Sequence, residues 1–485
     1  MPQLRDSGTR SLHATEPVPS AEMDGFCRIF GVETEYGVAV TGAERPVDAG
    51  QVAMTMFQPI VSRSRSTNTY LANGSRLYLD VGSHPEYATA EARDPREALG
   101  QDLAGEHVMR NLALKAQRKL RESYSEHATI HVFKNNVDSA GHAFGCHENY
   151  LVRRFVPLET IEHQLLPFLI TRQLYTGAGR VTPDGFQITQ RADFLDEAVS
   201  SATTRSRPMV NTRDEPHADP DSFRRLHVII GDSNRSQWST WMKLAVTHLV
   251  LCAIEDAFRL GTPSGFEHCA FADPAAANRT VSRFLDDPHA ELTLESGESV
   301  SALGLQRRYY AAVKAFIETH GDALASSLPA TTIVTIMGEW SRVLDALERG
   351  AYDALADRVD WAAKKRLFDA LKRRRPDVTF AQMEQLELDY HDIANGRLYG
   401  SLTSRNQMRE LLTGDDVEYA VHNPPTDTRA ALRGRFVDAA LNVGAQFSAD
   451  WTHLTLTAPE RREAILLDPF EAEPTPEFEQ LMEAL

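Results

Sequence analysis

Polar and apolar residues alternate in short runs over the first half of the chain, a pattern typical of half-buried β-strands. The run Arg-Ile-Phe-Gly-Val-Glu-Thr-Glu-Tyr-Gly-Val places Glu33 and Glu35 on one face of a strand, because strand side chains alternate with period two. The run Ser-Arg-Leu-Tyr-Leu-Asp-Val likewise places Arg76, Tyr78 and Asp80 on one face. Similar runs predict strands at 130–134, 148–152 and 226–232.

Longer stretches carry apolar residues at a spacing near 3.6 and therefore predict helices. These stretches are 95–122, 157–175, 236–260 and most of 305–395. Residues 261–304 carry Gly, Pro and Ser with weak periodicity, which indicates an insert, and the Gly-, Asp- and Pro-bearing segment 414–428 is typical of a linker. Together these patterns predict an α+β fold, in which a mixed sheet is surrounded by helices.

The same patterns divide the chain into three parts. Residues 1–25 are polar and lack the apolar core of a signal peptide, so we expect a disordered leader. Residues 26–412 are expected to form a large catalytic domain, and residues 413–485 a small C-terminal domain.

Composition excludes several classes of protein. With 51 Lys+Arg against 68 Asp+Glu, the net charge of −17 disfavours binding of nucleic acid through a general basic face. No apolar stretch approaches the roughly 20 residues that span a bilayer, so a soluble protein that does not enter a membrane is expected. The four cysteines form no Cys-x-x-Cys pair, which disfavours a zinc knuckle or a disulfide scaffold and suits the cytoplasm.

Common catalytic templates are absent from the sequence. It contains no Gly-Lys dipeptide and hence no P-loop, and it contains no Gly-x-Ser-x-Gly. His147-Glu148 begins like a zinc-protease motif, but Leu151 stands where the second histidine belongs. The chemistry must therefore come from other residues.

Carboxylates concentrate on the predicted strands. Glu33 and Glu35 share a face, and Asp80 and Glu86 flank a tight Gly-Ser-His-Pro turn. Carboxylates that converge on one sheet face repel one another unless a cation lies between them, and Mg²⁺ prefers oxygen ligands and also holds phosphates. The alternative is that Glu33 and Glu35 form the solvated face of a half-exposed sheet.

Arginines concentrate at 203–217, where Arg205, Arg207 and Arg213 precede an acidic Asp-Glu pair. The planar guanidinium meets phosphate oxygens with two parallel hydrogen bonds, which suits a triphosphate; the alternative is an ion-pair network. Together with the carboxylates, the loop indicates phosphoryl transfer without a P-loop. Asp80 would then serve as a general base or, alternatively, as another Mg²⁺ ligand.

Several long motifs in the chain closely resemble the family of bacterial Pup–protein ligases. They lie at 31–37, 73–91, 134–139, 145–151, 200–208, 211–218 and 428–434. The resemblance implies a fold similar to glutamine synthetase and the carboxylate–amine ligases, with the site on a curved sheet. It also implies use of ATP and Mg²⁺ to phosphorylate the γ-carboxylate of the C-terminal glutamate of Pup, a small disordered protein. A lysine of a target protein then displaces phosphate, and the resulting isopeptide bond marks the target for the bacterial proteasome.

The resemblance also assigns roles to individual residues. Positions matching the family's Mg²⁺ ligands are Glu33, Tyr78 and Glu86; those matching its ATP contacts are Arg76, Thr89 and Trp451; and Asp80 matches its catalytic base. Trp451 is expected to pack against the adenine, the alternative being an ordinary core aromatic. The chain departs from the family pattern in its long leader, at Ala198 and within 261–304, none of which touches these positions.

Rival functions on this resemblance are a Pup deamidase or depupylase with the same fold, a small-molecule glutamate–amine ligase, and an inactive adaptor that binds Pup. Only 35 residues separate Gly37 from Asn73 in this chain. The resemblance implies a longer loop between these two motifs in the depupylase branch, so the ligase is favoured. Because Pup-type modifiers are acidic, the basic stretches 364–366 and 372–375 are a candidate docking surface. The alternative is that these cations merely stabilise a helix C-terminus.

Overall fold

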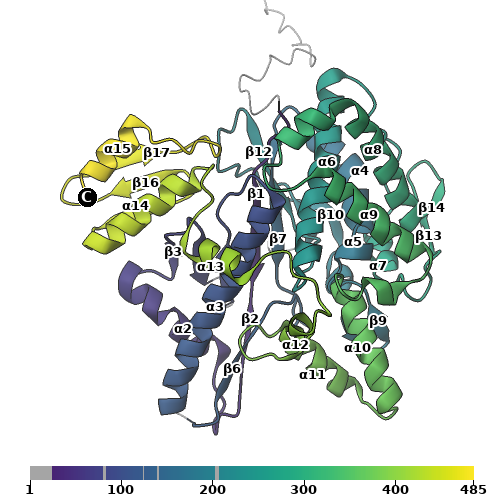
Figure 1. Ribbon diagram of the computed structural model, residues 1–485, viewed down its shortest axis with the longest axis horizontal. Helices are drawn as coiled ribbons and strands as arrows, with labels where there is room; N and C mark the ends of the chain where they lie inside the picture. Colours follow the sequence, from purple (N-terminus) through teal and green to yellow (C-terminus); the bar gives the residue numbers. More distant parts are fainter. Residues whose placement is uncertain (1–24, 80–83, 124, 139–140, 202–206) are drawn as a thin grey trace, which may run out of the picture.

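A mixed eight-stranded sheet lies at the centre of the molecule (Figure 1). The computed structural model describes residues 25–485 except 80–83, 124, 139–140 and 202–206. The strand order is β10-β11-β12-β7-β1-β5-β4-β3, and only β10 and β11 run parallel. The strands are β1 (Phe30–Glu35), β3 (Asn68–Tyr70), β4 (Arg76–Leu79), β5 (Pro85–Ala88), β7 (Cys146–Arg153), β10 (Glu197–Ser200), β11 (Pro208–Asn211) and β12 (Phe223–Val228).

Helices cover one face of this sheet and leave the other open. In β1 the side chains of Phe30, Val32 and Thr34 are buried, while Glu33 and Glu35 on the opposite face are half-buried. The covering helices supply the largest hydrophobic core, and α6 is buried over nearly its whole length. They are α3 (Pro95–Ser123), α4 (Leu158–Thr171), α5 (Gln173–Thr176) and α6 (Gln237–Leu260). Helices were therefore correctly predicted at 95–122, 157–175 and 236–260.

A helical layer continues outward on the right of Figure 1. Its helices are α7 (Pro274–Ser282), α8 (Ala302–Ser326), α9 (Ile333–Glu348), α10 (Asp360–Arg374), α11 (Phe380–His391) and α12 (Leu398–Ser404), with the 3₁₀ turns η1 (Ala192–Phe194) and η2 (Tyr352–Leu355). The stretch 261–304 forms α7 and a hairpin of β13 (Glu291–Thr293) and β14 (Ser299–Ser301), elements too short to produce clear periodicity. No helix in the described part of the chain is long and apolar enough to cross a membrane.

Two small antiparallel pairs accompany the main sheet. One joins β2 (Gly37–Thr41) to β6 (Thr129–Phe133), and with α2 (Ala49–Ser64) and α3 it encloses a second hydrophobic core. The other is the hairpin of β8 (Arg180–Thr182) and β9 (Gly185–Gln187).

The C-terminal residues form a unit with its own hydrophobic core, at the upper left of Figure 1. It comprises α14 (Ala430–Val443), β15 (Phe447–Ala449), β16 (His453–Leu456), β17 (Arg462–Ile465) and α15 (Pro476–Glu483), and we call it the C-terminal unit. Tyr70 of β3 packs into its core, so the unit is seated against the edge of the main sheet.

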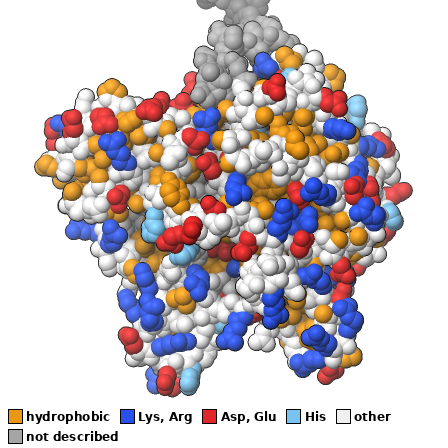
Figure 2. Space-filling view, in the orientation of Figure 1, with side chains coloured by type: hydrophobic (Ala, Val, Ile, Leu, Met, Phe, Trp, Pro, Cys, Tyr) orange, Lys and Arg blue, Asp and Glu red, His pale blue; other side chains and the backbone are white. Residues whose placement is uncertain are grey.

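The interpretation of 414–428 as a linker is wrong for its first half. Residues Gly414–His422 form helix α13, which packs against α3. The helix begins with a capping box, in which the Thr413 side chain accepts from the Asp416 backbone and the Asp416 side chain accepts from the Thr413 backbone. The exposed acidic residues Asp415, Asp416 and Glu418 gather over this helix, whereas elsewhere on the face in Figure 2 both signs of charge are interspersed.

Candidate active site

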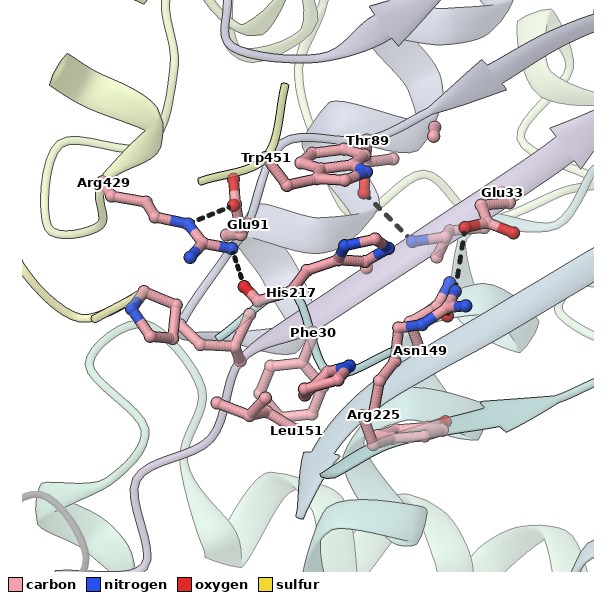
Figure 3. A pocket seen from close by; sticks show the side chains of 17 residues that line it. Phe30, Glu33, Thr89, Glu91, Asn149, Leu151, His217, Arg225, Arg429 and Trp451 are labelled. Carbon is pink, nitrogen blue, oxygen red and sulfur yellow. Dashed lines mark hydrogen bonds and ion pairs between the residues drawn. The ribbon is translucent and has the colours of Figure 1, made fainter. Parts of the chain in front are cut away.

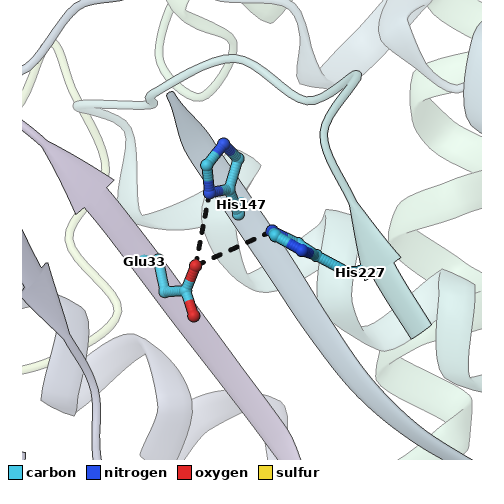
Figure 4. Close-up of side chains that lie close together, drawn as sticks. All are labelled: Glu33, His147 and His227. Atoms are coloured by element: carbon cyan, nitrogen blue, oxygen red, sulfur yellow. Dashed lines mark hydrogen bonds and ion pairs between the residues drawn. The ribbon is translucent and has the colours of Figure 1, made fainter. Parts of the chain in front are cut away.

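The open face of the sheet carries a row of polar side chains from adjacent strands. Because β1 and β7 pair with Glu33 opposite His147, and β12 continues the sheet beyond β7, Glu33, His147 and His227 point toward one another (Figure 4). His147 Nδ1 lies 3.2 Å and His227 Nε2 3.7 Å from Glu33 Oε2, and the two imidazole centroids are 4.7 Å apart. All three potential ligand atoms lie within 4.8 Å of one another, so this triad can hold a metal ion.

Electrostatics leave the triad's donors available for a cation. Burial, together with the neighbouring His147, lowers the pKa of His227 to about 3, so its imidazole is neutral. Its Nε2 has no hydrogen-bond partner in the described part of the chain. Burial opposes ionisation of Glu33, but the hydrogen bond from His147 and the charge of Arg225, 3.4 Å away, hold the pKa of this carboxyl below its usual range.

Two further carboxylates border the triad. Glu35 and Glu86 are directly opposite each other on the antiparallel strands β1 and β5. A Cβ atom at Gly145 would lie only 2.6 Å from Glu35 Oε1 and 2.4 Å from His147 Nε2, so any other residue there would displace both side chains. Like charges directly opposite in a sheet are destabilising, and a cation between them removes that cost.

Tyr78 is connected to this group through Glu86. Its hydroxyl donates to Glu86 Oε1, and burial together with the charges of Glu86 and Glu33 raises its pKa well above the usual value. The Arg76 guanidinium lies over the Tyr78 ring, 4.3 Å from its centroid, and its Nε donates to Asn68 Oδ1. Arg76 thus lies beside Tyr78 on β4 and does not line the pocket described next.

A pocket opens beside Glu33, between β1, β5, β7 and the C-terminal unit (Figure 3). Apolar side chains including Phe30 and Leu151 line one part of it, and Trp451 and His217 another. Thr89 lies at its edge, where its Oγ1 accepts a hydrogen bond of 3.0 Å from the Val32 backbone. An apolar, aromatic pocket next to a metal-type triad suits a nucleotide whose base enters the pocket and whose phosphates reach the triad.

A second cavity, of about 210 Å³, lies on another side of the triad, with Glu35, His147 and His227 in its wall. Arg191 lines it and is buried, donating from Nη1 to the Phe144 carbonyl (3.1 Å) and from Nη2 to the Ile229 carbonyl (2.6 Å). No carboxylate among the described residues forms an ion pair with it; burial lowers its pKa, and the nearby charges of Asp232 and Glu35 only partly oppose this shift. A buried cation without an ion-pair partner beside a cavity is a site for an anion.

The arginine-rich segment 203–217 contains one described arginine in a surface ion pair and one that lines the cavity of Arg191. Arg205 lies outside the described residues. Arg213 pairs with Glu215 at 2.6 Å and Asp214 pairs with Arg154 at 2.6 Å, so the ion-pair alternative applies to Arg213. Arg207 lines the cavity of Arg191, which leaves it a candidate for anion binding.

The hypothesis that the basic residues of α10 form a docking surface is wrong for Lys364. Lys364 is buried, where its Nζ donates to Glu387 Oε1 (2.6 Å) and to the Gly179 carbonyl (2.7 Å), so it is no part of a docking surface. Lys365 pairs with Asp369 on the same helix. Residues 372–375 are exposed at the end of α10, where the helix dipole also favours cations.

The site residues expected from the sequence thus fall into three groups. Glu33, Thr89 and Trp451 line one pocket; Tyr78, Glu86 and Arg76 neighbour it on β4 and β5; and Asp80 lies outside the described residues. The sequence analysis missed His147, His227, Arg225 and Arg191. A signal existed for the first three: His227 lies on a predicted strand, and His147 and Arg225 each lie one residue before a predicted strand, in alternation with Asn149 and His227.

Comparison with known proteins adds relatives over the whole chain. Residues 28–455 match the family model described as Pup-ligase protein. The Pup–protein ligase of Bifidobacterium longum (strain DJO10A) is 97% identical over 485 residues, covering 100% of both chains. That of Bifidobacterium dentium is 63% identical over 487 residues, again covering 100% of each chain.

Two solved structures are similar to this chain. One is the complex between the prokaryotic ubiquitin-like protein Pup and its ligase PafA, with TM-score 0.85, 37% identity and coverage of 95% of this chain and 92% of that one. The other is PafA in complex with ADP, with TM-score 0.77, 37% identity and coverage of 92% and 97%.

Proposed function

The chain belongs to the Pup-ligase family, and we propose that it uses ATP to join the C-terminal glutamate of Pup to a lysine of a target protein. One observation carries this proposal. The triad of Glu33, His147 and His227 has an aromatic pocket on one side and the cavity of Arg191 on another. A base, its phosphates and an acceptor carboxylate can therefore meet at one centre.

The nucleotide is assigned to the pocket of Thr89 and Trp451. The similar structure with bound ADP supports ATP as the energy source. Trp451 supplies a stacking surface for the base, and Arg76, opposite Ala88 on the neighbouring strand and over the Tyr78 ring, supplies a cation toward the phosphates.

Mg²⁺ is assigned to the oxygen atoms of Glu33, Glu86 and Tyr78, beside the two imidazoles of the triad. The oxygen donors of this group fit Mg²⁺, because the Glu33 carboxyl stays ionised and Glu35 lies opposite Glu86, while the neutral imidazole of His227 adds no positive charge beside the ion. When bound, the ion would neutralise phosphate charge during transfer. Arg225 orients Glu33 from the other side and donates to Asn149 Oδ1 at 2.9 Å.

The C-terminal glutamate of Pup is assigned to the cavity of Arg191 and Arg207, whose two guanidinium groups would attract its carboxylates. Its γ-carboxylate oxygen attacks the γ-phosphorus of ATP, the bond to the ADP oxygen breaks, and ADP leaves. A bare carboxylate is a poor electrophile, and the acyl phosphate so formed carries a leaving group.

The target lysine completes the reaction. Its amine attacks the acyl carbon, the carbon–oxygen bond to phosphate breaks, and phosphate leaves with the electron pair. An ammonium with a pKa near ~10.4 must lose a proton before it attacks, and we assign Asp80 as the group that accepts it.

The test is to incubate the purified protein with ATP, Mg²⁺, glutamate-ended Pup and a lysine-bearing target, and to detect the adduct by mass spectrometry. We expect an adduct that is lost in Asp80→Asn and retained in Asp415→Asn, which changes an exposed carboxylate on α13. Cleavage of a preformed conjugate without formation of a new one would overturn the proposal in favour of a depupylase.

A further inference from the structure

The carboxylate of Glu91 is buried between two arginines of the motif Thr-Arg-Ala-Ala-Leu-Arg-Gly at 428–434. Arg429 Nε donates to Glu91 Oε1 at 2.8 Å, Arg433 Nη1 donates to the same oxygen at 3.1 Å, and Arg433 Nη2 donates to Oε2. These arginines hold the pKa of Glu91 at about 2 although burial alone would raise it. The function proposed above gives this motif no role.

The remaining donors of the two arginines reach the walls of the nucleotide pocket. Arg429 Nη2 donates to the backbone carbonyl of His217 at 2.5 Å. Arg433 Nη1 donates to the backbone carbonyl of Trp451 at 3.2 Å, and its guanidinium lies over the indole, 4.9 Å from the ring centroid. One buried carboxylate is therefore connected, through one arginine each, to the backbone of His217 and of Trp451; Figure 3 shows the connection through Arg429.

His217 needs such a restraint. Its φ of +50° is in the left-handed region, which costs a non-glycine residue energy and persists only when neighbouring contacts enforce it. Its ring and that of Trp451 have centroids 6.2 Å apart with 42° between their planes, so the two rings form a wedge. Their separation depends on where the carbonyls of these two residues are held.

Hydrogen bonds and one close backbone contact also fix the position of the 428–434 motif against the main sheet. Arg433 Nε and Nη2 donate to the Gly74 carbonyl at 3.0 and 2.8 Å, and Thr428 Oγ1 donates to the Glu91 carbonyl at 3.0 Å. A Cβ atom at Gly434 would lie 2.3 Å from the Ala72 carbonyl oxygen, so only glycine permits this approach of α14 to the sheet. The backbone that carries Arg429 and Arg433 is therefore held in place relative to Glu91.

We propose that Glu91 is a positioning residue, which through Arg429 and Arg433 sets the separation of His217 and Trp451 and thereby the affinity for the nucleotide base. This inference rests on the proposed function, because it takes the pocket to be the nucleotide site. Glu91 and Arg429 lie in the wall of this pocket, and in this account Glu91 acts by fixing the two aromatic residues and makes no contact with the base or the phosphates.

Glu255 provides a matched control elsewhere in the molecule. It is also buried between two arginines, with Arg28 Nη2 at 2.6 Å and Arg153 Nη1 at 3.0 Å, and it lines no part of the nucleotide pocket. The experiment compares Glu91→Gln with Glu255→Gln by ADP titration calorimetry and by steady-state kinetics with ATP and Pup varied in turn. Arg429→Lys and Arg153→Lys form a milder pair that keeps each charge but removes the fork.

We expect Glu91→Gln and Arg429→Lys to raise the ADP dissociation constant and the KM for ATP at least tenfold, with the KM for Pup within twofold of the parent. Glu255→Gln and Arg153→Lys should leave nucleotide affinity unchanged. If Glu91→Gln does not fold, the comparison of Arg429→Lys with Arg153→Lys tests the inference on its own. Unchanged ADP affinity in folded Arg429→Lys, or an equal loss in Arg153→Lys, overturns the inference. Absence of ADP binding by the parent protein would instead overturn the nucleotide assignment itself.

Discussion

Glu35 and Glu86 are cross-strand partners, directly opposite each other on β1 and β5 and next to the triad of Glu33, His147 and His227. Such a pair is unfavourable in the absence of a cation, because like charges opposite each other in a sheet repel. The fold therefore brings two carboxyl groups together at the place where a divalent ion is proposed to bind.

This pair predicts opposite effects on stability and on activity. Glu35→Gln removes one charge and should stabilise the metal-free protein by about 0.5–1 kcal/mol. The same change should weaken Mg²⁺ binding and so raise the Mg²⁺ concentration for half-maximal ligation about tenfold. Urea denaturation in EDTA and a Mg²⁺ titration of activity measure the two effects. A variant with lower metal-free stability and unchanged Mg²⁺ requirement would contradict the prediction.

The buried guanidinium of Arg191 predicts a specific loss of affinity for the glutamate. Charge-assisted hydrogen bonds contribute about 1.5–3 kcal/mol, so Arg191→Met should raise the KM for Pup about 10- to 100-fold. The KM for ATP should change less than twofold, since Arg191 does not line the nucleotide pocket. The control is Arg213→Met, which breaks only the surface pair with Glu215. An equal effect on both substrates in Arg191→Met would indicate a general defect of the fold.

Replacement of Trp451 should affect the KM for ATP rather than the KM for Pup. Stacking of a base on an aromatic side chain is worth about 1–3 kcal/mol, so Trp451→Ala should raise the KM for ATP between about 5- and 100-fold. Fluorescence titration with a labelled ATP analogue gives the affinity directly. Tyr419→Ala, at an exposed aromatic on α13, serves as the control and should leave the affinity unchanged. An unchanged KM in Trp451→Ala would favour the interpretation of Trp451 as an ordinary core aromatic.

Glu97 predicts a pH-dependent stability at the junction of α3 and the segment before α14. Burial, followed by the charges of Asp427 and Asp94, raises the pKa of Glu97 from 4.5 to about 7. The folded protein therefore binds a proton that the unfolded chain releases, and stability falls as pH rises from about 4.5 to about 7. Above pH 7 the full cost, about 2 kcal/mol after allowance for solvent screening, is present.

Glu97→Gln removes this ionisation and should stabilise the protein at pH 8 but hardly at pH 5. Urea denaturation at the two pH values measures the difference. Glu122→Gln, at an exposed position of the same helix, should show no such difference. Equal stabilisation by Glu97→Gln at both pH values would mean that the titration of another group governs this region.

Alternation and helical periodicity predicted most of the scaffold of the site, because these patterns report which face of an element is buried. They placed Glu33 and Glu35 on one face of β1 and gave α3 and α6 nearly their observed bounds. They could not predict that β12 adjoins β7, so the approach of His227 to His147 was missed. Strand order depends on long-range packing, which a local pattern does not contain.

Local chemistry was misread where a short motif had two structural uses. The Gly-Asp-Asp run after Thr413 resembles a loop in composition, yet with Thr413 it forms a capping box that starts α13. Lys364 resembles a surface cation, but Glu387 from the next helix compensates its charge in the interior. The structure of the first motif depends on a reciprocal hydrogen bond between Thr413 and Asp416, three residues apart. The burial of Lys364 depends on Glu387, which lies on another helix.

The sequence separation of Glu91 and Arg429 has a consequence for folding. These residues are 338 positions apart, so the walls of the nucleotide pocket meet only when distant parts of the chain have already found each other. Contacts of this separation form late, after the cores of the individual parts. We therefore expect the nucleotide pocket to be the last region completed during refolding, and undocking of the C-terminal unit to be an opening step that ADP suppresses.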